Sequence, residues 1–296
     1  MFDTIVIGAG PGGLAASIYI RRSNMKVAIV EGDVPGGQVT NTALVENYPG
    51  FEEIPGADLS MKMYMQATKL GAEYISEFAT SVDKTPEGFE VGLKSGRKLE
   101  AKTVIISTGM KHRKLDVPGE EKYDGKGVSW CAICDGNLYK GKDVAVVGGG
   151  NSAVGESLYL SGIANKVYLI HRRRQFRADD ILVEKIRRIK NIELVLDDEI
   201  ARMDGGEALE KLTLKSGREL KVEGLFEYIG FLPSSELVSH LNITNDAGFI
   251  KVDKNCQTDI KGLYAVGDIV EKEIRQIVTA VGDGAIAALH AVKCCR

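Results

Sequence analysis

The sequence is poor in the features that mark secreted and membrane proteins. It has 5 cysteines among 296 residues, and an odd number in a long chain argues against a disulfide framework and for thiols that stay reduced or cycle. No stretch approaches the ~20 apolar residues that span a bilayer. The first residues lead directly into a strand pattern, without a basic flank or a cleavable apolar segment. We therefore expect a soluble, cytoplasmic protein with no membrane partner.

An excess of positive charge is also absent. The formal net charge is -3, which provides no general attraction to DNA, RNA or anionic lipid. Nucleic acid is therefore not expected as a partner. A chain of this length exceeds the size at which one hydrophobic core keeps growing, so two domains are expected.

A pattern of strand, glycine-rich loop, helix and strand occurs twice. The first copy occupies residues 4–7, 8–13 (GAGPGG), 14–21 and 26–30, and the second occupies residues 143–147, 148–153 (GGGNSA), a helix to about 161 and residues 166–170. Each copy is one βαβ unit of the type that binds dinucleotides. The likeness extends further, because LKSGRKL at 93–99 recurs as LKSGREL at 214–220, with Ser-Gly as the expected hairpin turn. Ungapped extension then pairs Gly109 with Gly230.

These repeats predict an α/β fold with two Rossmann-like, three-layer nucleotide-binding domains. Residues 262–268 form a strand that ends in an acid, and a helical stretch follows from about 276 to 292. This segment has no glycine fingerprint, so we assign it to the first domain. The first domain is then discontinuous (1–112 and 240–296), and the second, 113–239, is inserted into it. The connectors near 111–119 and 231–235 each contain proline and suit a hinge.

The first glycine loop predicts a site for FAD or NAD. Gly8, Gly10 and Gly13 permit a tight turn, close approach to a pyrophosphate and close helix packing, and the helix N-terminus offers free N–H groups. Glu31 lies 23 residues after Gly8, where a carboxylate accepts hydrogen bonds from ribose hydroxyls and repels a 2′-phosphate. The alternative is a tight turn without a ligand.

The second loop, with Gly148 and Gly150, predicts a site for NADPH. His171 lies 23 residues after Gly148, in place of the acid, and opens the sequence HRRRQFR. The guanidinium groups of Arg172, Arg173 and Arg177 suit a 2′-phosphate. The alternative is a solvated charged run or a nucleic-acid patch.

Asp268 ends the third strand and has two interpretations. It could cap the last helix, or it could accept a hydrogen bond from the ribityl chain of a flavin bound to the same domain. We favour the second interpretation. The positive end of the last helix would then point at the flavin pyrimidine, where a reduced flavin carries negative charge.

Cys131 and Cys134 form a close-spaced dithiol. A ring of four residues stabilises a fold by only about 2 kcal/mol in the loop-entropy treatment, whereas one attacking and one resolving thiol suit disulfide exchange. A zinc half-site is the alternative, but Cys256, the Cys294–Cys295 pair and four scattered histidines provide no second ligand pair at zinc spacing. We therefore expect no metal.

Asp135 follows the dithiol directly. Its carboxyl could move a proton to the departing thiolate, or it could be only a turn residue before Gly136. The dithiol lies on the domain that binds NADPH, yet it has to meet the flavin and an outside substrate. We therefore expect the inserted domain to rotate between two poses.

Taken together, these motifs resemble the small, bacterial-type thioredoxin reductases. The matches are GAGPGG, GGQVTNT from Gly36, VENYPGF from Val45, CAICDG, GGGNSA, HRRRQFR and GDIVEKEIRQ from Gly267. The resemblance implies a homodimer, one FAD per subunit, NADPH as electron donor and thioredoxin as acceptor. It also implies that Cys134 is the cysteine nearer the flavin. The implied FAD residues are Glu31, Gly36, Gly37, Gln38, Asn47, Gly109, Gly267, Asp268, Arg275 and Gln276, and the implied NADPH residues are Asn151, Ser152, His171, Arg172, Arg173 and Arg177.

Some features depart from that family or leave alternatives open. Arg174 stands where the family often has an acid, and its charge could strengthen the preference for NADPH. Cys294 and Cys295 could be a second redox pair, but we favour reduced thiols on a frayed end, and we expect Cys256 to be inert. A reductase with another acceptor and a non-catalytic redox sensor are the competing functions.

Overall fold

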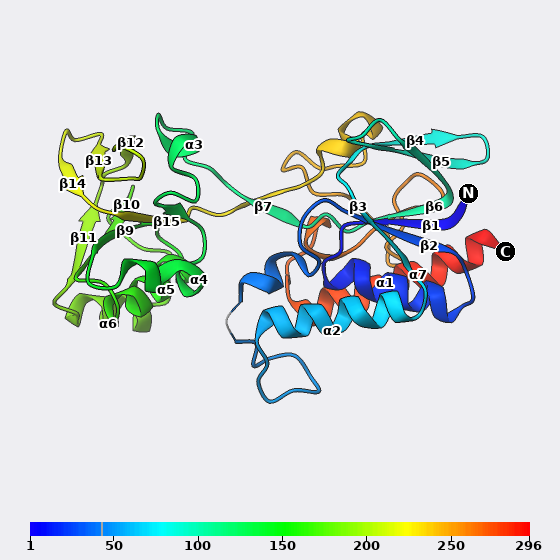
Figure 1. Cartoon of the computed structure of the whole chain (residues 1–296), viewed down its shortest axis with the longest axis horizontal. Helices are drawn as coiled ribbons and strands as arrows, with labels where there is room; N and C mark the ends of the chain where they lie inside the picture. The colour runs from blue at the N-terminus through cyan, green and yellow to red at the C-terminus, as the bar shows by residue number, and fades with distance from the viewer. Residues whose placement is uncertain (43) are drawn as a thin grey trace. The chain divides into compact units, whose positions relative to one another are not determined.

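The structure is a computed structural model that describes residues 1–42 and 44–296, apart from the side chain of Cys134. It separates into two compact units (Figure 1). The first unit consists of Met1–Lys111 with Leu232–Arg296, and the second of His112–Phe231. The second crossing therefore precedes the boundary at 239 that the sequence suggested. The reason is the short 3₁₀ helix η3 (Glu236–Leu241), whose Val238 is fully buried in the core of the first unit.

The first unit is built on one sheet with helices on one face (Figure 1). Its parallel strands are β3 (Glu73–Ser76), β2 (Val27–Glu31), β1 (Phe2–Ile7), β6 (Lys98–Ile106) and β17 (Leu263–Ala265), in that order across the sheet, and β5 (Gly88–Leu93) and β4 (Ala79–Thr85) continue it from β6 as antiparallel strands. The helices are α1 (Pro11–Arg22), α2 (Gly56–Lys69) and α7 (Ile277–Cys295). The third strand of the sequence analysis thus joins the first sheet beside β6.

The second unit repeats this plan. Its parallel sheet has the order β11 (Ile192–Leu196), β10 (Lys166–His171), β9 (Asp143–Gly148), β15 (Gly224–Tyr228) and β8 (Val128–Ser129). A separate antiparallel sheet contains β12 (Ile200–Asp204), β13 (Lys211–Leu214) and β14 (Glu219–Lys221), and the helices are α3 (Glu120–Tyr123), α4 (Ala132–Asp135), α5 (Asn151–Ser161) and α6 (Asp180–Arg188). The predicted fold class is confirmed.

The apolar runs of β1 and β9 form the centres of the two sheets because both faces of each strand are buried. In β1, Ile5 and Ile7 contribute to one hydrophobic cluster and Val6 to the cluster on the opposite face. In β9, Val144 and Val146 face one cluster and Ala145 the other. Each glycine loop thus follows the carboxyl end of a central strand that is buried on both faces.

Both predicted hairpins are present. The backbone N–H of Leu93 donates to the carbonyl of Arg97, and Leu214 donates to Arg218, each at 2.9 Å. Gly96 and Gly217 both have a φ of +87°, a value that glycine adopts at no steric cost.

Two short strands connect the units. These are β7 (Met110–His112) and β16 (Phe231–Pro233), which pair in a two-stranded sheet. Each follows a glycine with positive φ, Gly109 at +61° and Gly230 at +108°. Gly109 and Gly230, which the sequence repeat pairs, therefore occupy equivalent places in the structure, directly before a connecting strand.

Helix α7 corrects the expectation that no segment is apolar enough to span a membrane. By length and composition alone, its 19 residues could do so. One such helix is weak evidence, since core helices of globular proteins share these properties. Gly284 lies against α1 so closely that a methyl group on it would sit 2.2 Å from the carbonyl oxygen of Gly12, and the small side chains around it are buried. The small, buried side chains of α7 thus serve helix packing in the first unit, whereas only 33% of the apolar window is buried.

Candidate nucleotide sites and redox segment

The first glycine loop links β1 to α1 and is tightly constrained on its inner side. A methyl group on Gly8 would lie 2.3 Å from the carbonyl oxygen of Ser107, and one on Gly13 would lie 2.1 Å from that of Gly8. At Gly10, no described atom lies within 4 Å of such a methyl group. Gly10 also precedes α1, and among the described side chains none caps this helix end. The loop therefore presents an open surface and free N–H groups, as an anionic pyrophosphate requires.

Glu31 lies at the end of β2, directly beside this loop. Its carboxylate accepts hydrogen bonds from the backbone N–H groups of Ala9 at 2.8 Å and of Asp33 at 3.0 Å. These bonds fix an acidic group next to the glycine loop, where ribose hydroxyls of a dinucleotide would be recognised.

The other residues predicted to bind FAD gather in the same unit. Gly36 donates its N–H to the carbonyl of Ala9 at 2.8 Å, and Gly37, in η1 (Gly37–Asn41), faces Gly10 so that a methyl group on it would lie 3.5 Å from the Cα of Gly10. Gln38 donates to the carbonyl of Met110 at 3.3 Å.

Two more of these residues come from the opposite ends of the chain. Asn47 Nδ2 donates to Gln276 Oε1 at 3.1 Å, across 229 residues of sequence. Gln276 also forms the capping box of α7 with Thr279. Sequence motifs far apart in the chain thus converge at the N-terminus of α7.

Asp268 lies in η4 (Gly267–Ile269), and the helix cap of α7 is Gln276, so the interpretation of Asp268 as the cap is wrong. Burial raises the pKa of Asp268, against the opposing charges of Lys272 and Arg275. The guanidinium of Arg275 lies 4.5 Å from the ring centre of Phe249, and its Nε is buried without an acceptor in the part of the chain that is described. A buried donor without a partner fits a site completed by an anionic, acceptor-rich cofactor such as FAD.

The second glycine loop follows β9 and repeats this construction. A methyl group on Gly148 would lie 2.4 Å from the carbonyl oxygen of Tyr228, whereas Gly150 has no described atom within 4 Å. His171 ends β10, as Glu31 ends β2, but its ring lies beneath the loop. A methyl group on Gly149 would lie 2.1 Å from His171 Cε1, and the ring stacks on Phe176 at 5.3 Å. Burial lowers the pKa of His171, so a neutral imidazole supports the loop.

The arginines after His171 divide into two groups. Arg172, Arg173 and Arg177 are exposed, and in the described ranges none forms an ion pair. Arg174 instead donates from Nε to Asp197 at 2.5 Å. The extra charge at position 174 is therefore matched by a neighbouring acid, and the uncompensated charge of this segment belongs to the three arginines predicted to bind phosphate.

The side chain of Asn151, the first residue of α5, forms hydrogen bonds within the protein. Asn151 Nδ2 donates to Asp179 Oδ2 at 3.1 Å, and the backbone N–H of Asp179 donates to Asn151 Oδ1 at 2.8 Å. The neighbouring Ser152 is exposed. Asn151 thus joins the start of α5 to the segment before α6, which leaves backbone N–H groups at the helix end for a ligand.

Cys131 is disulfide-bonded and immediately precedes α4. Its backbone N–H donates to Ser129 Oγ at 3.1 Å, and Ser129 Oγ donates to Asp135 Oδ2 at 2.6 Å. Cys134 is a residue of α4, but its side chain lies outside the described part of the structure. The hydroxyl of Ser129, which sequence reasoning did not identify, therefore ties Asp135 to the backbone of Cys131.

Two consecutive residues at the end of β15 also contact this segment. The backbone N–H of Ala132 donates to Tyr228 Oη at 2.8 Å, and Trp130 Nε1 donates to Glu227 Oε2 at 3.2 Å. Burial raises the pKa of both Tyr228 and Glu227. Sequence reasoning missed both residues, although an acid inside the apolar run GLFEY was a signal.

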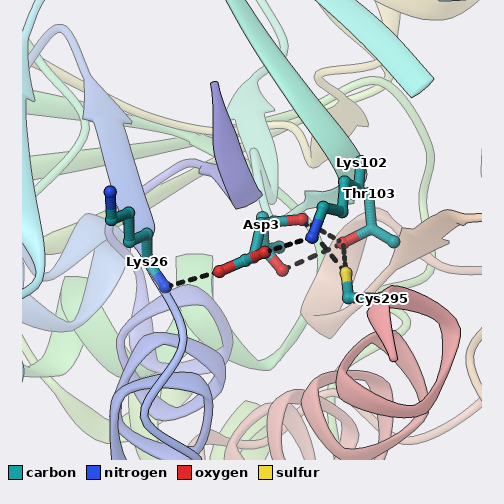
Figure 2. A network of polar contacts seen from close by, with 6 residues as sticks. Asp3, Lys26, Lys102, Thr103 and Cys295 are labelled. Atoms are coloured by element: carbon teal, nitrogen blue, oxygen red, sulfur yellow. Dashed lines mark hydrogen bonds and ion pairs between the residues drawn. The ribbon is translucent and has the colours of Figure 1, made fainter. Parts of the chain in front are cut away.

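The remaining cysteines are free thiols. Burial raises the pKa of Cys256 to about 12, in agreement with an inert residue. Figure 2 shows that the C-terminal end of α7 is anchored: Cys295 Sγ donates to the carbonyl of Asp3 at 3.3 Å and lies 3.7 Å from Thr103 Oγ1. The expected frayed end is therefore wrong, while Cys294 is exposed.

Within the described residues, no three His, Cys, Asp or Glu side chains are placed to hold a metal.

Comparisons with known proteins agree with this arrangement. The sequence pattern of the pyridine nucleotide-disulphide oxidoreductases matches residues 2–284. The chain is 44% identical to the thioredoxin reductase of Mycoplasma genitalium, over 98% of this chain and 94% of that protein, and 42% identical to that of Bacillus subtilis, over 97% and 93%.

Solved structures give the same result. A crystal structure of Lactococcus lactis thioredoxin reductase superposes with a TM-score of 0.89 at 40% identity, covering 100% of this chain and 99% of that one. The thioredoxin reductase of T. acidophilum follows with a TM-score of 0.85 at 33% identity, over 99% and 98%. The resemblance seen in the motifs is confirmed, and FAD and NADPH are the cofactors of this family, as predicted. The chain therefore belongs to the pyridine nucleotide-disulphide oxidoreductase family and, within it, to the thioredoxin reductases.

Proposed function

We propose that this chain is an NADPH-dependent thioredoxin-disulfide reductase in which the Cys131–Cys134 pair passes electrons to the protein substrate. The observation that carries the proposal is the position of the disulfide-bonded Cys131. It lies in the unit that also contains the second glycine loop and the three arginines that form no ion pair among the described residues. One unit thus combines a nucleotide site with an oxidised thiol pair, and the other unit has a second nucleotide site of matching design.

The two nucleotide sites have different electrostatics. In the first unit, Glu31 is suited to ribose hydroxyls and opposes a 2′-phosphate, so we assign FAD to this site together with Asp268 and Arg275. In the second unit, Arg172, Arg173 and Arg177 supply positive charge for the 2′-phosphate of NADPH. When bound, NADPH supplies a hydride and FAD carries the two electrons onward to the disulfide.

Asp135 is assigned the proton chemistry of the dithiol. Reduction of a disulfide produces thiolates, and the thiolate that leaves needs a proton. The Asp135 carboxylate is held in place by the Ser129 hydroxyl, which in turn accepts the N–H of Cys131. This chain of hydrogen bonds orients an acid that directly follows Cys134 and lies four residues after Cys131.

An assay of NADPH oxidation with purified thioredoxin tests the proposal, with NADH as the control donor. We expect activity with NADPH well above that with NADH, and complete loss in a Cys134→Ser variant. The matched control is the double variant Cys294→Ser/Cys295→Ser. It also replaces thiols by hydroxyls, but at the end of α7 and far in sequence from the glycine loops, so turnover should be kept. Thioredoxin reduction that persists in Cys134→Ser would contradict the dithiol assignment.

Stopped-flow mixing with NADPH separates the reductase from a non-catalytic redox sensor. A reductase passes electrons beyond the flavin, so four electrons are taken up by the holoenzyme; a sensor takes up two. The Cys134→Ser variant should behave like the sensor, because only its flavin can be reduced.

We also propose that the protein is a cytoplasmic homodimer. Helices α1, α2 and α7 are neighbours in the first unit (Figure 1). Large apolar side chains are exposed on all three. They are Tyr19, Met61, Met65, Val278, Ile286 and Leu289, each at least 40% exposed. An apolar surface of this kind supports association with a second copy. Three free thiols agree with a reducing compartment.

A further inference from the structure

The sole tryptophan of the chain immediately precedes Cys131 and is held from two sides. Trp130 Nε1 donates to Glu227 Oε2 at 3.2 Å. The ring of His112 stacks on the indole with 5.8 Å between ring centres and 28° between planes. The position of Trp130, and with it the start of the redox segment, therefore depends on Glu227 as hydrogen-bond acceptor.

Glu227 is a carboxyl group in an unusual place. It is 1% exposed, and its second oxygen, Oε1, is buried with no hydrogen-bond partner among the described residues. The nearby carboxylate of Glu120, on α3, also lies in the core at 3% exposed. Two carboxylates cannot both be ionised at close range in a buried site, so one of them has to hold a proton.

The hydrogen bonds identify which carboxyl holds it. Glu120 accepts three backbone N–H groups, from residues 115–117, at 2.7–3.4 Å, which is the environment of a carboxylate anion. Among the described residues, Glu227 accepts only the indole N–H. Burial, reinforced by the nearby Glu120 carboxyl, raises the pKa of Glu227 to about 9, and Trp130 and Lys114 oppose this only in part. Glu227 is therefore a neutral acid at neutral pH.

The next residue of β15 holds the other side of the cysteine. Tyr228 Oη accepts the backbone N–H of Ala132 at 2.8 Å. The register that places β15 here is the pairing of Leu225 with Val128 and of Phe226 with Ser129 in β8. Consecutive residues of one strand thus hold the two chain neighbours of Cys131.

We propose that protonated Glu227 is a positioning residue for the redox segment: it holds Trp130 in place, and loss of its proton puts a second charge beside Glu120 in the core, which moves Glu227 together with Trp130 and displaces the start of the dithiol motif. The functional part of this inference rests on the proposed role of the Cys131–Cys134 pair. Ionised Glu227 would face the Glu120 anion in the core, and Lys114 is the only cation identified that acts on it. The segment has to rearrange to let water or a counter-ion reach the new charge. His112, which faces Trp130, does not titrate in this range, because burial lowers its pKa.

The fluorescence of Trp130 in the oxidised holoenzyme reports this change directly, since no other tryptophan emits. We expect a transition in emission between pH 7 and 10 with a midpoint near 9 in the unmodified protein, and no such transition in Glu227→Gln. The amide keeps an oxygen acceptor for the indole but cannot ionise. Tyrosine ionisation affects both proteins equally and cancels in the comparison. A Glu120→Gln variant should lower the midpoint, because it removes the like charge.

Turnover with thioredoxin tests the functional part. The alkaline decline of kcat in the unmodified protein should be reduced in Glu227→Gln, and Glu227→Leu, which lacks an acceptor for the indole, should lower kcat at least tenfold relative to Glu227→Gln without raising KM for NADPH. An emission transition that is absent from the unmodified protein, or equal in Glu227→Gln, would overturn the positioning role. If the emission transition is present but the protein fails to reduce thioredoxin, the proposed function is wrong. The inference that Glu227 positions Trp130 would then still hold.

Discussion

At the scale of single residues, the buried acid Glu227 makes folding stability depend on pH. Its pKa is raised to about 9 in the folded protein, against an unfolded value near ~4.3. The folded state therefore binds more protons than the unfolded state between these values, and the free energy of unfolding falls as pH rises through that window, by up to about 1.4 kcal/mol per pH unit.

We expect Glu227→Gln to remove this dependence. Its free energy of unfolding should exceed that of the unmodified protein at pH 8, and the difference should be smaller at pH 5. Urea denaturation at both pH values measures this. Equal pH dependence in the two proteins would show that Glu227 titrates normally.

The arginines after His171 provide a second test with an internal control. Replacing Arg172 and Arg173 with alanine should lower kcat/KM for NADPH by roughly a hundredfold or more, since each charge-assisted hydrogen bond contributes about 1.5–3 kcal/mol. Arg174→Ala should have little effect, because that side chain pairs with Asp197. Steady-state kinetics with both nicotinamide donors measures the change, and a large loss in Arg174→Ala would reverse the assignment.

How well sequence predicts a residue depends on how local its signal is. Glu31 could be placed because its offset from Gly8 follows from one βαβ unit. Glu227 and Tyr228 could not, because their contacts to the redox segment depend on the pairing of β15 with β8, almost 100 residues apart in the chain. Ser129 could not, because no motif marks its hydroxyl as the partner of Asp135. The acid inside the apolar run GLFEY marks Glu227 as unusual, but a pairwise contact between distant strands leaves no motif that identifies its partner.

At the scale of elements, the second glycine loop depends on the packing of Gly149 against His171. A methyl group there would overlap the imidazole ring, so Gly149→Ala should displace the loop and weaken NADPH binding at least tenfold while FAD stays bound. The control is Gly155→Ala in the middle of α5, where no described atom lies within 4 Å of the new methyl group. That change should stabilise the helix by up to about 1 kcal/mol. Calorimetric NADPH titration and flavin absorbance distinguish the two variants.

The strands, glycine loops and hairpins could be predicted because each follows from a short pattern. The end of α7 could not. The terminal sequence Cys-Cys-Arg predicts a frayed end, but Cys295 donates a hydrogen bond to Asp3 in β1 (Figure 2). The Lys102 ammonium lowers the pKa of the Asp3 carboxyl through a direct hydrogen bond. That anchor joins the two termini of the chain, and no local pattern reports it.

At the scale of the whole molecule, the exposed apolar side chains of α1, α2 and α7 predict how the protein assembles. Ile286→Glu would place a charge in that surface, and a buried charge without a partner strongly destabilises an interface. We expect light scattering to give twice 32.0 kDa for the unmodified protein and a lower mass for the variant. Ile181→Glu, at an exposed position of α6, is the control that should stay dimeric. An unaltered mass for Ile286→Glu would place the interface elsewhere.

The two connections between the units predict where movement takes place. Gly109→Ala and Gly230→Ala each put a side chain at a positive φ with open space around it, at a strain of about 1–2 kcal/mol. Gly217→Ala in the β13–β14 hairpin has the same strain and space and is the matched control.

If the inserted unit rotates during turnover, all three variants should lose similar thermal stability, but only the two at the connections should lower kcat, by severalfold. Differential scanning fluorimetry and turnover with thioredoxin measure the two quantities. An engineered crosslink between the units should abolish turnover; full activity in the crosslinked protein would contradict the rotation.

The first unit is assembled from both ends of the polypeptide, whereas the second is one uninterrupted stretch, His112–Phe231. On the ribosome, the inserted unit is therefore complete while the first unit still lacks β17 and α7. A further 65 residues, from 232 to 296, have to be synthesised before those elements arrive, which takes about 3–13 s at ~5–20 residues per second. During that interval the nascent α1 has no α7 to cover it, and it is a surface on which chaperones would act.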